Sequence, residues 1–175
     1  MSPATIFNLH LALGYIPWLL FFGAYFWPKL KTMGHVEAQR AIATLHSFRI
    51  FGLVFILPGV VGSHLPAGLA GFAAYGDFAT GLLAILALLM ARTLFFWPLV
   101  VAYNFMGTAD ILIDYYHGVV LDLPSQAGQL GAAYAIVILY VPLLMITHFA
   151  AFYLLARVKR EPANPARNEA LSGSA

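Results

Sequence analysis

Residues 130–156 read LGAAYAIVILYVPLLMITHFAAFYLLA and contain no aspartate, glutamate, lysine or arginine. A helix that rises 1.5 Å per residue crosses a hydrocarbon core of about 30 Å in roughly 20 residues, so this stretch is long enough to span a membrane. Four further runs of comparable length and apolarity precede it. The sequence therefore predicts an all-α membrane protein, a five-transmembrane-helix bundle with spans at about 6–27, 41–62, 72–91, 94–116 and 130–156.

The composition agrees with a fold that is solvated by lipid. The chain of 175 residues is 62% hydrophobic and 9% charged, whereas a soluble domain has about 25% charged residues. It contains no cysteine, which excludes a disulfide framework and a thiolate metal site. The first apolar run has no basic residue before it and extends over roughly 22 residues, longer than the 7–15 of a signal sequence, so we expect a retained span.

The basic residues indicate the orientation. All nine lie on one side of the predicted bundle: Lys29, Lys31, Arg40, Arg49, Arg92, Arg157, Lys159, Arg160 and Arg167. The N-terminus and residues 63–71 and 117–129, on the other side, have none. The positive-inside rule then predicts an outside N-terminus and a cytoplasmic C-terminus in a bacterial-type inner membrane. We expect a single transmembrane domain over residues 1–160 and a disordered cytoplasmic tail over residues 161–175.

One group of ionisable side chains is expected in the outer half of the bundle. His10, Asp77, Asp110, Asp114 and His117 come from three predicted spans at similar depth. An ionisable side chain within a span costs about 2.5–3.5 kcal/mol, so each needs a partner, water or a function. Asp110 is placed about two turns deep and is the predicted centre of this site.

The fourth span presents these residues as a stripe. Tyr103, Gly107, Asp110, Asp114 and His117 follow spacings of three or four residues, which places them on one helix face toward the bundle interior. Carboxylates and imidazoles together suit proton transfer, so Asp110, Asp114 and His10 are candidate catalytic residues. The candidate ligand-binding residues are Tyr15, Asp77, Tyr103, Asn104 and His117. The spacing matches no metal motif, and an interhelical hydrogen bond is the simplest role for Asn104.

A second group is expected in the inner half. His46 and Arg49 lie in the second span and His148 in the fifth, and the two histidines are expected at similar height. Two histidines on facing helices could ligate one haem b, with Arg49 meeting an anionic group of that haem or of a quinone. The alternative is that each histidine is hydrogen-bonded to a neighbour while Arg49 extends toward the inner surface.

Prolines are expected to shape the bundle. Pro17, Pro58, Pro98 and Pro142 place one proline in four of the five predicted spans. A proline inside a transmembrane helix frees a carbonyl group and often kinks the axis, which can open space between helices.

Three functions stay open at this level. The first is a bundle with an outward-facing polar cavity, which binds a small amphipathic or cationic molecule or acts on a lipid-like substrate by proton transfer. The second is a haem- or quinone-binding subunit of an electron-transfer complex, and the third is a non-catalytic assembly subunit. The cofactor and any enzymatic activity are left unassigned. Lipids, a small-molecule ligand and a second copy or partner membrane subunit are the expected partners; nucleic acid is not.

Overall fold

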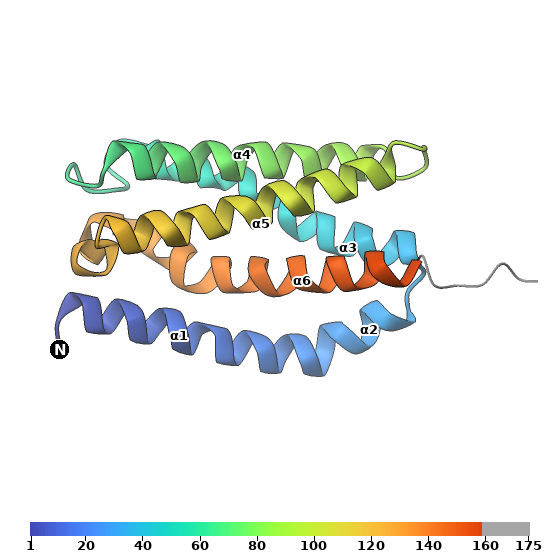
Figure 1. The fold of residues 1–175 in the computed structure, drawn as a ribbon, viewed down its shortest axis with the longest axis horizontal. Helices are drawn as coiled ribbons and strands as arrows, with labels where there is room; N and C mark the ends of the chain where they lie inside the picture. The colour runs from blue at the N-terminus through green and yellow to red at the C-terminus, as the bar shows by residue number, and fades with distance from the viewer. Residues whose placement is uncertain (159–175) are drawn as a thin grey trace, which may run out of the picture.

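The computed structural model describes residues 1–158, and this part of the chain consists of helices joined by short turns and loops (Figure 1). The expected tail over residues 161–175 lies outside the described residues. The α-helices are α1 (Pro3–Phe21), α2 (Trp27–Thr32), α3 (His35–Ser47), α4 (Ala67–Leu89), α5 (Phe96–Val120) and α6 (Val141–Val158). Shorter helical segments join them: the π-helices η1 (Phe22–Phe26) and η4 (Ile136–Tyr140), and the 3₁₀-helices η2 (Phe48–Ile56) and η3 (Leu123–Ala133).

Four helices are long and apolar enough to cross a membrane: Pro3–Thr32, Ala67–Leu89, Phe96–Val120 and Ile136–Arg157. They confirm the all-α class and indicate a multi-pass membrane protein. The expected count of five is not shown, because the span expected at 41–62 is built from α3 and η2 and is not one of the four. That segment ends at Ile56, and α4 begins at Ala67 rather than at 72.

The 3₁₀-helix η2 is long for its type, with nine residues; such runs rarely exceed three or four. Its buried residues are Arg49, Gly52 and Phe55, which are spaced by three. Because a 3₁₀-helix has three residues per turn, this spacing places all three on one face. The 3₁₀ geometry therefore directs Arg49 into the bundle.

Two of the four prolines, Pro58 and Pro98, lie in a loop or at a helix start rather than inside a helix. Pro58 follows η2, and Pro98 lies in the first turn of α5. A proline is tolerated in a first turn because its missing N–H would have no partner there. Pro17 lies within α1, and Pro142 lies within the continuous helix Ile136–Arg157, directly after its π-helical turn.

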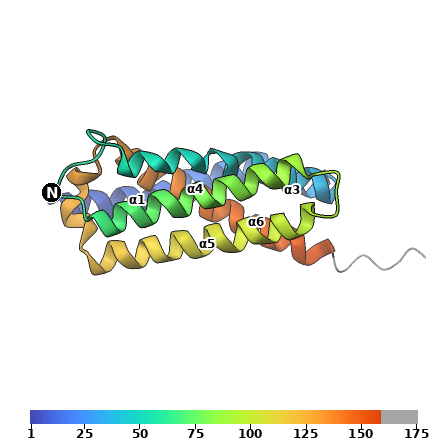
Figure 2. The same cartoon turned by 90° about the horizontal axis from the view of Figure 1, so that it is seen from above.

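The helices run side by side along one axis (Figures 1 and 2). α4 packs against α5, α3 and η2, and α6 packs against α3 and α5. α1 lies at the periphery, where it packs against η3, η4 and α6. The N-terminus, the loop 57–66 and η3 lie at one end of the bundle, whereas the α2–α3 turn, the loop 90–95 and the end of α6 lie at the other (Figure 1).

Candidate functional site

Arg49 occupies the interior of the bundle with only 1% of its surface exposed. Its Nε donates to Asp77 Oδ1 on α4 at 2.6 Å, and its Nη2 donates to Asp110 Oδ2 on α5. Its Nη1 donates to the Gly107 carbonyl at 3.2 Å. One guanidinium thus joins η2, α4 and α5, and its planar fork is suited to bind two carboxylates at once.

Glycines provide the space for this ion network. A Cβ atom at Gly52 would collide with the Asp77 carboxyl group, and one at Gly76 with the Asp110 carboxyl group. A Cβ atom at Gly107 would collide with Arg49 Nη1 and would lie 2.6 Å from His148 Nε2. The network therefore depends on helix surfaces that carry no side chain at these three positions.

The network continues into α6 through His148. Arg49 Nη1 lies 3.2 Å from His148 Nε2, and His148 Nδ1 lies 2.9 Å from Asn104 Oδ1 on α5. Because an arginine has no acceptor, His148 accepts at Nε2 and donates its Nδ1–H to Asn104. Asn104 thus forms the interhelical hydrogen bond expected of it.

His46 lies against His148 at the same depth. The ring centroids are 4.0 Å apart, as expected from the similar heights of the two residues, and His46 Nε2 lies 3.1 Å from Thr147 Oγ1. The axial ligands of a haem stand on opposite faces of the porphyrin, whereas these two rings contact each other directly. The residues present therefore do not fit a haem between them.

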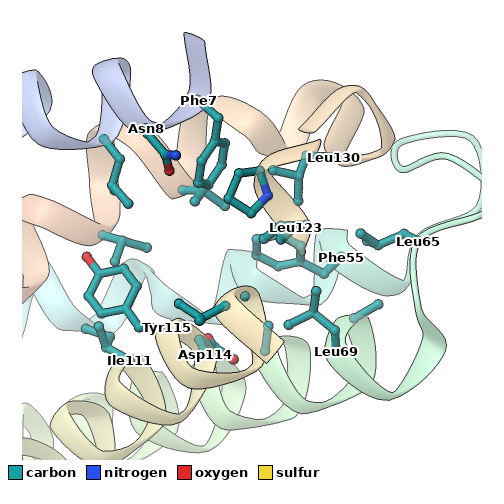
Figure 3. Close-up of a pocket in the computed structure, with 18 of the residues that line it drawn as sticks. Phe7, Asn8, Phe55, Leu65, Leu69, Ile111, Asp114, Tyr115, Leu123 and Leu130 are labelled. Carbon is teal, nitrogen blue, oxygen red and sulfur yellow. The ribbon is translucent and has the colours of Figure 1, made fainter. Parts of the chain in front are cut away.

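A cavity of about 470 Å³ begins beside Arg49 and extends toward the end of the bundle that carries η3 (Figure 3). Its walls are mainly apolar and come from α1, η2, α4, α5, η3, η4 and α6. Its polar lining includes the side chains of Asn8, Tyr15, Arg49, Asp77, Asp114 and Tyr115. Arg49 and Asp77 are the buried members of this set, and the lining as a whole is mainly apolar.

Asp114 lies on α5, one turn after Asp110, and lines this cavity (Figure 3). Its Oδ1 is buried and has no hydrogen-bond partner in the structure. A buried carboxylate oxygen without a hydrogen-bond donor is energetically unfavourable.

The structure brings some predicted residues together and separates others. Tyr15, Asp77 and Asp114 line the cavity, and the Tyr15 hydroxyl lies 2.7 Å from that of Tyr115. Asp110 is not among the lining residues because its carboxylate is turned to Arg49. The remaining candidates lie elsewhere.

The remaining candidates are His10, Tyr103, Asn104 and His117, and none of them lines the cavity. His10 Nδ1 lies 2.8 Å from the Tyr134 hydroxyl, and the His117 ring packs edge-on against Phe72. Tyr103 is fully buried against His46, with ring centroids 5.5 Å apart.

Sequence reasoning missed the link between the two expected groups. Arg49 was placed with the inner histidines, but its side chain reaches the carboxylates of Asp77 and Asp110 as well. A signal was present, because a lone arginine within an apolar run has few partners other than carboxylates in neighbouring runs.

These features define a helical membrane protein with a buried ion network beside an amphipathic cavity. No group of three or more histidine, cysteine or acidic side chains within residues 1–158 could hold a metal ion. The chain belongs to the family described as a domain of unknown function (DUF8737), whose model matches residues 6–156. No curated protein and no solved structure matches the chain.

Proposed function

We propose that this protein binds a small amphipathic molecule with a cationic or hydrogen-bond-donating group in the cavity beside Arg49. The observation that carries this proposal is the cavity itself, which combines apolar walls with a few polar side chains that include Arg49, Asp77 and Asp114. Its volume of about 470 Å³ falls within the range of about 300–1,000 Å³ that is usual for small-molecule sites.

The charges in and beside the cavity favour a cation over an anion. Arg49 contributes one positive charge and is already bonded to Asp77 and Asp110. Asp114 adds a third carboxyl group, whose Oδ1 has no partner. An ammonium group would pair with the Asp114 carboxyl group, whereas an anionic head group would meet the carboxyl groups of Asp77 and Asp114 and no free cation in the cavity lining.

Any proton transfer to a bound molecule falls to Asp114 in this proposal. Among the three candidate catalytic residues it alone lines the cavity. Asp110 is held by Arg49, and His10 is bonded to Tyr134. An enzymatic activity of the site would therefore use Asp114 as its acid or base.

We further propose that α3 and η2 together form a fifth span. At 1.5 Å per residue for α3 and 2.0 Å for η2, this segment reaches about 37 Å, which exceeds a hydrocarbon core of about 30 Å. The cavity would then lie in the outer half of a bacterial-type inner membrane, with the N-terminus outside. The reason is that α2, the start of α3, the loop 90–95 and the end of α6 lie toward the other end (Figure 1) and carry the basic residues Lys29, Lys31, Arg40, Arg92 and Arg157.

The binding proposal is tested with dodecylamine and the protein in lipid nanodiscs, with empty nanodiscs subtracted. We expect saturable binding and weaker binding of dodecanoate, which has the same chain length and the opposite charge. Asp114→Asn should weaken dodecylamine binding by about 10-fold or more, since a hydrogen bond to a charged group contributes about 1.5–3 kcal/mol. Asp122→Asn is the matched control, because Asp122 is exposed and lies outside the cavity.

Equal binding of the amine and the carboxylate, unchanged by Asp114→Asn, would contradict the proposed preference for a cation. A complete lack of saturable binding would contradict the binding function and favour the alternative of an assembly subunit. The haem alternative gains no support, because the contact between His46 and His148 leaves no room for a porphyrin.

A further inference from the structure

The exposure of the lining residues locates the mouth of the cavity. On the wall formed by η2 and α4, lining residues such as Phe55 and Leu69 are buried. Three lining residues are exposed: Asn8 and Ala12 on α1 and Val119 on α5. The mouth therefore lies between α1 and α5 and opens sideways from the bundle.

Helices α1 and α5 do not close this mouth by packing. α1 packs against η3, η4 and α6, and α5 packs against α4, α6 and η3. A side-chain contact bridges the two helices at the deep edge of the mouth, where the Tyr15 and Tyr115 hydroxyl groups are 2.7 Å apart. One hydrogen bond between two hydroxyl groups contributes only about 0.5–1.5 kcal/mol, so breaking this contact between the two helices requires little free energy.

The end of the bundle, in contrast, is covered. η3 lies across it, and its lining residues Leu123 and Leu130 are buried (Figure 3). A water-soluble molecule that approached along the bundle axis would meet this apolar cover before it reached the buried polar side chains of Arg49 and Asp77.

The surface around the mouth is apolar. The exposed residues next to it on α1 and α5 are mainly large hydrophobic side chains: Leu9, Leu13, Ile16, Leu112 and Tyr116. Such a surface on a membrane-spanning helix faces lipid tails.

We propose that the ligand reaches the cavity from within the bilayer, through the mouth between α1 and α5. The ligand is then a membrane-dissolved, single-chain amphiphile that enters with its polar group first and leaves its chain among the apolar walls. This inference rests on the proposed binding function and specifies both the class of ligand and its route.

The test labels a cysteine inside the cavity in lipid vesicles. The chain has no cysteine of its own, so Ala73→Cys introduces a single reporter thiol on the α4 wall. Two maleimides are compared: N-dodecylmaleimide, which dissolves in the bilayer, and a sulfonated maleimide, which stays in water. Leu112→Cys, exposed on α5, gives the reference labelling rate for N-dodecylmaleimide. Ser125→Cys, exposed on η3, gives the reference labelling rate for the sulfonated maleimide.

We expect Ala73→Cys to react with the dodecyl reagent within about tenfold of the Leu112→Cys rate. With the sulfonated reagent it should react slower than Ser125→Cys by about tenfold or more. Labelling by the sulfonated reagent at the Ser125→Cys rate would overturn the membrane route, and so would a failure of both reagents to label Ala73→Cys.

A matched pair of substitutions then tests the mouth. Val119 and Val120 are adjacent on α5 and are 79% and 60% exposed, but only Val119 lines the cavity. In the Ala73→Cys background, Val119→Trp should slow labelling by the dodecyl reagent about tenfold, and Val120→Trp should leave it unchanged. Equal rates in the two variants would overturn the assigned mouth. Dodecylamine binding could still be present in that case, so this failure is distinct from a failure of the proposed function.

Discussion

Arg49 carries a positive charge into a part of the bundle where two carboxylates contact it directly. Its removal would leave Asp77 and Asp110 buried without a counter-charge. We expect Arg49→Gln to lower the free energy of unfolding by about 3–5 kcal/mol, the usual effect of removing one partner from a buried ion pair. Thermal unfolding of the purified protein measures this change.

Arg92→Gln is the control for this substitution, because Arg92 is exposed in the loop between α4 and α5. The triple variant Arg49→Gln, Asp77→Asn and Asp110→Asn should recover part of the lost stability, since it removes the unpaired charges together. A triple variant that is no more stable than Arg49→Gln would contradict the ion network as the cause.

Gly107 provides a second test at the scale of residues. An alanine Cβ at position 107 would lie within 2.7 Å of His148 Nε2 and Thr80 Cγ2. Both of these side chains are fully buried. We expect Gly107→Ala to destabilise the protein by about 1–3 kcal/mol, as overpacking does. Gly71→Ala, on α4 with no atom near its Cβ position, should be neutral or stabilising, because alanine favours a helix more than glycine does. Unfolding temperatures that rank the two variants in the opposite order would contradict this account.

The π-helix η4 interrupts regular α-helix at the place where this part of the chain meets α1 and α3. η4 is a π-helical turn directly before α6, and its last residue, Tyr140, donates its hydroxyl to the Leu45 carbonyl near the end of α3 at 2.7 Å. Its neighbour Leu139 accepts from the Trp18 indole N–H of α1 at 2.7 Å. Side chains of one helix thus satisfy carbonyl groups of another where regular hydrogen bonding is interrupted.

Tyr140→Phe tests this connection between elements. Loss of the hydrogen bond to Leu45 should lower the free energy of unfolding by about 0.5–1.5 kcal/mol and should increase amide hydrogen exchange at the end of α3. Tyr153→Phe is the control, because Tyr153 is partly exposed and packs through its ring against Trp27 and Arg157. Equal exchange at the end of α3 in both variants would show that the bond does not order this junction.

At the scale of the whole molecule, the distribution of basic residues predicts the orientation. A reporter that is active only in the cytoplasm should be active when fused at Ala175, and a reporter that is active only outside should be active when fused after Leu123. The opposite pair of activities would invert the topology and would place the cavity in the inner half of the membrane.

The sequence predicted the positions of the four long apolar helices, because length and apolarity are local properties of a run. It did not predict which way Arg49 points, because that depends on the rotation imposed by η2 and on the space left by Gly107. The sequence analysis also placed Arg49 in the inner half of the bundle and Asp77 and Asp110 in the outer half. An arginine side chain is long enough to bridge this difference in height. The apolar part of the cavity could not be predicted from the sequence. It is a space left between segments that are far apart in the chain, including η3, and their packing is not a local property.

The buried ion network also constrains how the chain enters the membrane during its synthesis. Residues 35–56 include Glu37, Arg40 and Arg49 and are not among the long apolar helices. In chain order, the first carboxylate that pairs with Arg49 is that of Asp77 on α4, the helix that follows this segment. We therefore expect this segment to be retained at the translocon until α4 has emerged from the ribosome, and the two to pass into lipid together as a helical hairpin. A nascent chain truncated before α4 should leave residues 35–56 outside the bilayer.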